Sequence, residues 1–205
     1  NNTYNLVLQV EEAKKQVLLV YNYAHPDVGA IVRSLERVEA YEINTINAKQ
    51  LSTTDLKTAN AVVYFEGKQE AGFWEELKQL KLPVLIMDPS LSTLKDIGIT
   101  VETTQEHEIQ PLLNMQFDRF RIEDLNDDFT NVPALETFFG NYIMSPAWNT
   151  LYWQGVDGIN TQAPLVATAQ SINNGVSVCI GNQYWKWRLN TFARSASFEA
   201  FDTWV

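Results

Sequence analysis

Six residues whose side chains can bind a ligand or transfer a proton follow closely after strongly hydrophobic segments of the chain. They are Asn22, Tyr23, His25, Glu66, Asp88 and Ser90. An imidazole and a carboxylate at one site can activate water, so His25 and Asp88 together could serve a hydrolase. We favour a structural interpretation, in which His25 caps the helix that Pro26 begins and Asp88 accepts hydrogen bonds from the following turn.

The hydroxyl and thiol groups of the chain lack the local sequence that nucleophilic catalysis needs. Ser90 has no flanking glycines of a nucleophile elbow, and it is better placed to cap a helix from Thr93 onward. Cys179 is the single cysteine, which excludes an internal disulfide. Because it lies inside the apolar run 176–180, we expect a buried structural thiol.

Metal and cofactor sites have no support in the sequence. His25 and His107 are far apart, and neither belongs to a His-x-x-x-His pair. Asp124, Asp127 and Asp128 lack the spacing of a calcium loop, so a solvated acidic turn is the better interpretation. The chain also has no glycine-rich loop of the kind that holds phosphate. We therefore expect no metal and no cofactor.

Three aromatic residues in a stretch rich in amide side chains form a second candidate site. They are Trp148, Tyr152 and Trp153. Aromatic rings beside amides can hold a sugar or a peptide, or form an interface with a partner protein. The alternative, which we favour, is that these rings cover the edge of a sheet as a structural cap.

The elements that must position the first site are alternating strands and helices. Three nearly unbroken apolar runs predict strands that are buried on both faces, and hence a parallel sheet covered by helices. In such sheets a ligand binds beyond the carboxyl ends of the strands, where the six residues lie. The predicted strands are 16–22, 41–46, 61–65 and 83–87, and the predicted helices are 26–38, 52–57 and 70–80.

The second half of the chain is less regular. Asn173-Asn174-Gly175 predicts a hairpin between segments 164–169 and 176–180. Residues 183–194 are predicted as a helix with Trp185, Leu189 and Phe192 facing inward. The remaining expectations are a short strand at 97–103, β structure at 113–124, a turn at 126–128, a short helix at 133–139 and a loop-rich stretch at 140–160.

Composition excludes several classes of function. The 205 residues carry a net charge of −10, and 45% of them are hydrophobic, which is typical of a globular domain. A protein that binds the nucleic-acid backbone needs clustered Lys and Arg, so we expect no nucleic-acid partner. No apolar run is long enough to span a membrane, so we expect no membrane insertion by this fragment. The chain begins without Met and stops within a helical pattern begun at Phe198, so we expect an excised domain of a longer protein.

Four segments together resemble a known family: VLLVYNYAHPD (17–27), AVVYFEG (61–67), LPVLIMDPS (82–90) and SVCIGNQYWKWRL (177–189). They are similar to class I glutamine amidotransferase-like domains, of the divergent uncharacterised type found in membrane-anchored bacterial multidomain proteins. The most specific part is the closing pattern at Gly181, Trp185, Trp187, Arg188 and Leu189. In this cluster we expect a hydrophobic core and a buried arginine paired with a carboxylate.

The resemblance implies an α/β fold with a flavodoxin-like, doubly wound and mostly parallel sheet. It places the domain at 16–205, with an irregular β-rich extension at 105–180, after an edge strand and linker at 1–15 from a preceding module. The enzymes of this family pair a cysteine on a tight strand-to-helix turn with a later histidine. By element order these positions fall on Asp88 and Asn182. The catalytic pair is therefore missing.

We accordingly expect a non-catalytic module that senses a ligand or binds a protein, with a hydrolase using His25 and Asp88 as the alternative. The ligand site is the crevice of Asn22, Tyr23, His25, Glu66, Asp88 and Ser90. The resemblance implies a cell-envelope protein with an extracytoplasmic, periplasmic domain, and a cytoplasmic location is the alternative. Expected partners are other domains of the same protein or envelope proteins, and a small molecule, sugar or peptide.

Overall fold

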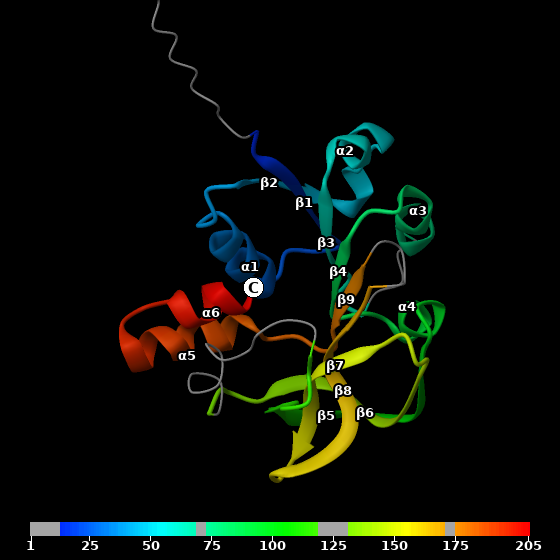
Figure 1. The fold of residues 1–205 in the computed structure, drawn as a ribbon, viewed down its shortest axis with the longest axis vertical. Helices are drawn as coiled ribbons and strands as arrows, with labels where there is room; N and C mark the ends of the chain where they lie inside the picture. The colour runs from blue at the N-terminus through cyan, green and yellow to red at the C-terminus, as the bar shows by residue number, and fades with distance from the viewer. Residues whose placement is uncertain (1–12, 69–72, 119–130, 171–174) are drawn as a thin grey trace, which may run out of the picture.

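The apolar runs of the first half form the parallel strands that the sequence predicts. In the computed structural model, which describes residues 13–68, 73–118, 131–170 and 175–205, five parallel strands lie in the order β2-β1-β3-β4-β9 (Figure 1). This is the flavodoxin-like order of a doubly wound sheet. The strands are β1 (Lys15–Tyr21), β2 (Tyr41–Asn47), β3 (Ala61–Phe65), β4 (Val84–Met87) and β9 (Val176–Cys179).

Helices cover both faces of this parallel sheet, as the resemblance implies (Figure 1). One face is covered by α1 (Pro26–Leu35), α5 (Trp185–Ser195) and α6 (Glu199–Trp204). The other face is covered by α2 (Thr53–Thr58), which the 3-10 turn η1 (Ala48–Gln50) precedes, α3 (Phe73–Leu80) and α4 (Leu91–Asp96). Two hydrophobic cores result, one on each side of the sheet.

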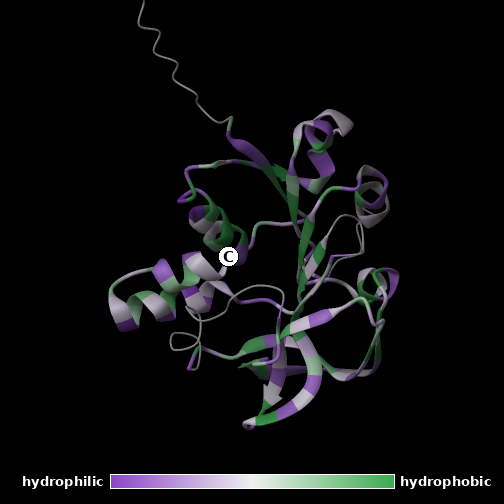
Figure 2. Ribbon diagram, viewed as in Figure 1, coloured by the Kyte–Doolittle hydropathy of each residue, from purple (hydrophilic) through white to green (hydrophobic). Residues whose placement is uncertain are grey.

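The sheet continues beyond β9 with four antiparallel strands, so that nine strands form one sheet. The added strands lie in the order β8-β7-β5-β6. Hydropathy alternates along them, whereas β1, β3 and β4 are more uniformly hydrophobic (Figure 2). Their bounds are β5 (Ile99–Leu113), β6 (Leu135–Met144), β7 (Asn149–Val156) and β8 (Ile159–Ala169).

Three expectations for this second half are wrong. The segment predicted as a helix at 133–139 lies largely in β6, where Leu135 and Thr137 are buried and Glu136 between them is exposed, the period of a strand. The stretch 140–160 is mostly strand and not loop-rich. The β structure predicted at 113–124 ends at Leu113, and residues 119–124 lie outside the described residues, as do the turn 126–128 and the segment 1–12.

The closing elements are confirmed with one correction. Strands β8 and β9 pair antiparallel, with Ala169 opposite Val176, as the hairpin predicts, although its turn at 171–174 lies outside the described residues. Helix α5 forms, but it buries Trp187 and Arg188, while Leu189 is 53% exposed and Phe192 is 46% exposed. The expected inner face of this helix is therefore wrong for Leu189 and Phe192.

Candidate functional site

The turn after β4 holds an acidic residue in an unusual backbone conformation. Asp88 has a φ of 49°, a region that residues other than glycine seldom adopt, and its side chain is 1% exposed. Two backbone hydrogen bonds hold it there: Asp88 N donates to Cys179 O (2.9 Å), and Lys68 N donates to Asp88 O (2.7 Å). A positive φ at a strand-to-helix turn is the conformation that a nucleophile elbow requires.

The two carboxylate oxygens of Asp88 have different surroundings. Oδ2 accepts a hydrogen bond from Asn182 Nδ2 (3.1 Å). Oδ1 is buried, and no donor among the described residues reaches it. Burial raises the pKa of Asp88 to about 6, although the Asn182 bond and the nearby Lys68 cation act in the opposite direction. Among the described residues, one oxygen of Asp88 is therefore an acceptor that lacks a partner.

Asn182 reaches Asp88 because the chain turns sharply after β9. Gly181 has a φ of 106°, and a Cβ at this position would lie 2.7 Å from Glu136 O. Only glycine fits this approach of the turn to β6. Asn182 N then donates to Glu136 O (3.2 Å), which fixes the residue that faces Asp88. Asp88 and Asn182, the positions that the resemblance assigns to the nucleophile and the base, are thus in direct contact.

His25 has the structural role that we favoured. It is the N-cap of α1, where its Nδ1 accepts a hydrogen bond from Asp27 N (3.2 Å). Its ring stacks on Phe65, with 4.9 Å between the ring centres, and its side chain is 18% exposed. His25 is also close enough to Asp88 for its charge to bear on that carboxyl's pKa.

Asp27 is a buried carboxylate that the sequence analysis missed. Its oxygens accept hydrogen bonds from Gln183 N (2.8 Å) and Trp185 N (2.7 Å), so it caps the start of α5 from a distant part of the chain. The side chain is 0% exposed. An acidic residue in the first turn of a helix is ordinary, and nothing in the local sequence indicates a second helix as its partner.

Glu66 and Ser90 use their polar atoms within the fold. Glu66 is buried, and its oxygens accept from Ser90 N (2.9 Å), Ser90 Oγ (3.0 Å) and Thr93 Oγ1 (2.8 Å). Ser90 Oγ also caps α4 by accepting from Thr93 N, which confirms the predicted cap. Asn22 Nδ2 donates to Glu66 O (2.8 Å). These three predicted ligand residues therefore stabilise the edge of the sheet.

Tyr23 and Lys68 flank Asp88 at this edge. The ring of Tyr23 lies against Gly67, whose φ is 66° and where any Cβ would overlap the ring. Burial raises the pKa of Tyr23, and the charges of Asp88 and Asp27 raise it further. Lys68 Nζ pairs with Glu106 Oε1 (2.8 Å) and also bears on the pKa of Asp88. This edge of the sheet thus brings a phenol, a cation and a carboxylate close enough together for their charges to interact.

The aromatic candidate site is largely hydrophobic core. Trp148 is 6% exposed and donates from Nε1 to Ile97 O (3.0 Å), and Tyr152 is 1% exposed within β7. Only Trp153 is half-buried. An exposed aromatic platform is therefore wrong for Trp148 and Tyr152, because the turn before β7 and β7 itself place these rings inside the protein.

The remaining candidates also have structural roles. Cys179 is 2% exposed, and burial raises the pKa of its thiol to about 12. Arg188 is 8% exposed, with its Nε 3.6 Å from Asp202 Oδ1 and its guanidinium over the Phe198 ring, which confirms the predicted buried pair. Within the described residues, no group of three or more His, Cys, Asp or Glu side chains could hold a metal ion.

Comparison with known proteins identifies the fold. No model of a protein family matches the chain, and no curated protein matches it. Solved structures do match. A glutamine amidotransferase from Thermotoga maritima superposes with a TM-score of 0.50 at 11% identity, covering 90% of this chain and 84% of that one. A ThuA-like protein from Bacteroides uniformis gives 0.53 at 13% identity, covering 90% and 93%.

A β-galactosidase from Bacillus circulans sp. alkalophilus superposes with a TM-score of 0.54 at 11% identity. The match covers 90% of this chain but only 31% of that chain, so this fold also occurs as one part of a larger protein. Together these structures show that the chain has the fold of a glutamine amidotransferase-like α/β domain. Of the helices in the described part of the chain, none has the length and hydrophobicity that crossing a membrane requires.

Proposed function

We propose that this domain is a non-catalytic module that binds a ligand or a partner protein at its strand-end crevice. The observation that supports the proposal is the Asp88–Asn182 contact, because the resemblance assigns these two positions to the thiol and the imidazole of the family's enzymes. Neither an amide nor a hydrogen-bonded carboxylate can supply the thiolate that amidotransferase chemistry uses.

The crevice favours a ligand that donates a hydrogen bond. Asp88 Oδ1 is a buried acceptor that no donor in the described part of the chain reaches, and leaving such an atom unpaired costs free energy. An amide N–H or a hydroxyl of a small molecule, sugar or peptide would satisfy it. Tyr23 and Lys68, at the rim, would then contact the polar groups of the same ligand.

The place of the domain in a larger cell-envelope protein is part of this proposal. The match to 31% of a β-galactosidase chain is consistent with a fold that serves as a module beside other domains. Its partners would be other domains of the same protein or envelope proteins, in an extracytoplasmic compartment. Fractionation of cells that express the full-length protein tests the location, and a wholly cytosolic protein would contradict it.

A hydrolase that uses His25 and Asp88 is the second candidate. A carboxyl with a pKa of about 6 can exchange protons near neutral pH, and this observation favours it. Against it, His25 Nδ1 already accepts the hydrogen bond that caps α1. The non-catalytic proposal therefore accounts for more of the contacts at the edge.

Two screens separate the candidates. In the first, the wild-type protein, His25→Ala and Asp88→Asn are assayed against panels of esters, amides and glycosides. We expect no turnover, and turnover that either variant abolishes would overturn the proposal. In the second, small polar compounds are screened by ligand-observed NMR. We expect hits that bind the wild type and lose affinity in Asp88→Asn, because the amide cannot offer the same charged acceptor.

A further inference from the structure

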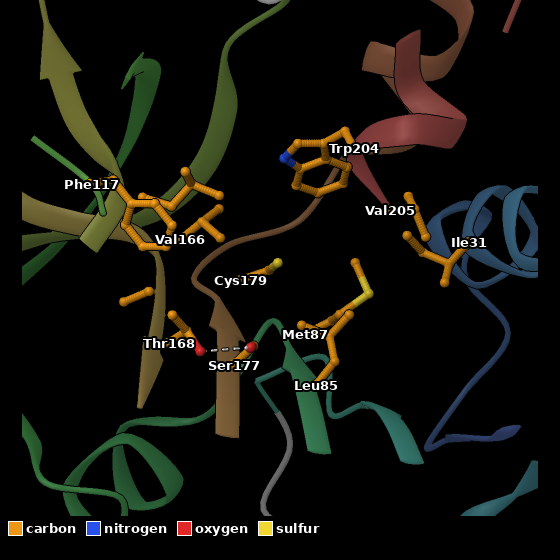
Figure 3. A pocket seen from close by; sticks show the side chains of 12 residues that line it. Ile31, Leu85, Met87, Phe117, Val166, Thr168, Ser177, Cys179, Trp204 and Val205 are labelled. Atoms are coloured by element: carbon orange, nitrogen blue, oxygen red, sulfur yellow. Dashed lines mark hydrogen bonds between the residues drawn. The ribbon is translucent and has the colours of Figure 1, made fainter. Parts of the chain in front are cut away.

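A cavity of about 280 Å³, partly open to solvent, lies on one face of the sheet beside the carboxyl ends of β4 and β9. Its floor is the sheet face formed by Leu85, Met87, Ser177 and Cys179, and α1 and α6 cover it through Ile31 and Trp204 (Figure 3). The side chains of β4, β9, α1 and α6 in Figure 3 point toward one shared space. A wider groove of about 560 Å³ shares Leu85, Ser177 and Val205 with the cavity and continues from it along the sheet.

The lining of the cavity defines the chemistry of an occupant. None of the twelve lining residues has a side chain that is charged near neutral pH, since the raised pKa of Cys179 keeps its thiol protonated. The polar side chains among them, apart from the Trp204 indole, are Thr168 and Ser177, and Ser177 Oγ donates to Thr168 Oγ1 (3.2 Å). This lining would penalise a charged group and favour an apolar one.

The size of the cavity favours a small molecule as the occupant. An engineered apolar cavity of ~150 Å³ stays dry and binds benzene, and this cavity is larger. Apolar atoms placed in this cavity would gain dispersion contacts with its walls and would remove apolar surface from water. The Thr168–Ser177 pair offers one place for a ligand oxygen, because Thr168 Oγ1 donates no hydrogen bond to a described residue.

We propose that this cavity is a binding site for an uncharged, mainly apolar molecule of two fused rings or comparable bulk that carries a single hydroxyl or carbonyl oxygen. The ring system lies against Met87 and Cys179, and its oxygen faces Thr168 and Ser177. The site is independent of the crevice, because Asp88, Tyr23 and Lys68 do not line it.

Methionine methyl groups report directly on this site. The chain has three methionines, of which Met87 lines the cavity, Met144 packs against the core on the opposite sheet face, and Met115 is 73% exposed. With methyl-labelled methionine, we expect naphthol to shift the Met87 signal saturably and to leave Met144 and Met115 unchanged. Naphthalenesulfonate has the same rings with a charge, and we expect it to leave Met87 unchanged.

Variants at Ser177 supply the matched controls. Ser177→Phe fills the cavity and is expected to weaken naphthol binding at least about tenfold, while Ser177→Ala keeps the space and is expected to weaken it less. An unchanged Met87 signal in the wild type, equal shifts with naphthalenesulfonate, or undiminished binding by folded Ser177→Phe would each overturn the proposal. If Ser177→Phe fails to fold, the comparison of the two probes on the wild type still decides. If another part of the chain or a second copy already fills the cavity, naphthol cannot enter, and the Met87 signal of the wild type stays unchanged.

Discussion

Two buried carboxylates at the same edge of the sheet differ in how they are satisfied. Asp27 is 0% exposed, and both of its oxygens accept backbone N–H groups at the start of α5. Asp88 is 1% exposed, yet one oxygen accepts a single amide bond and the other accepts none from a described residue. A fully bonded carboxylate connects elements of the fold, whereas the half-bonded one keeps an acceptor that, in our proposal, a ligand satisfies.

The largest expected effect concerns the fully bonded carboxylate. Asp27→Ala removes the acceptors of Gln183 N and Trp185 N, and we expect it to lower the free energy of unfolding by about 3–4 kcal/mol. Urea denaturation near neutral pH measures this, with Asp88→Asn as the matched variant, for which we expect a loss below about 1 kcal/mol. Equal losses of unfolding free energy in Asp27→Ala and Asp88→Asn would contradict the distinction between the two carboxylates.

The half-bonded carboxylate makes stability depend on pH. Burial raises the pKa of Asp88 from 3.8 to about 6, so between these values the folded protein binds the proton more tightly than the unfolded chain does. The free energy of unfolding therefore falls by about 2–3 kcal/mol as pH rises through this window. Above the window, the contribution of Asp88 no longer changes with pH. Denaturation curves of the wild type and Asp88→Asn across the window measure the difference. A wild type that gains stability with pH relative to the variant would contradict this sign.

Glu66 is a third buried carboxylate, and like Asp27 its oxygens accept hydrogen bonds from within the fold. Glu66→Gln keeps the shape but places an amide donor against the donors of Ser90 and Thr93, and we expect a loss of about 2 kcal/mol. Thermal unfolding tests it, with Glu108→Gln on an exposed position of β5 as the control. A loss no larger than that of the control would mean that Glu66 is free to serve a ligand.

A kinetic prediction, which does not bear on stability, concerns the single thiol beside the elbow. With a pKa raised to about 12, Cys179 should react with iodoacetamide at about pH 8 roughly a thousandfold more slowly than an ordinary thiol. Mass spectrometry before and after denaturation in urea follows the alkylation. Rapid alkylation of the folded protein would reveal an exposed thiolate and reopen a catalytic interpretation of this edge.

The parallel half of the fold was predictable because most residues of its central strands are buried on both faces. Runs such as 61–65 have few polar residues, and in such strands composition alone indicates burial. The antiparallel half was not predictable in the same way. Just before β6, Pro133 and the residues after it resemble a helix start, and only pairing with β5 decides that Leu135 and Thr137 face inward.

The candidate site was predictable in part for a related reason. Residues that follow parallel strands meet at one edge, so Tyr23 and Asp88 could be placed together from the order of elements. The roles of Asp27 and Glu66 depend on contacts with distant backbone N–H groups, which no local pattern indicates. The same is true of Trp148, whose indole donates to Ile97 O across the start of the antiparallel strands.

The most direct test is the titration of the Asp88 side chain itself, followed by carboxyl-carbon NMR in the wild-type protein and assigned by its absence in Asp88→Asn. Burial with one free oxygen at the elbow predicts a midpoint of about 6. A midpoint at or below 3.8, the ordinary value for this carboxyl, would show that water or a protein donor already satisfies both oxygens, and would contradict a crevice built around an unpaired acceptor.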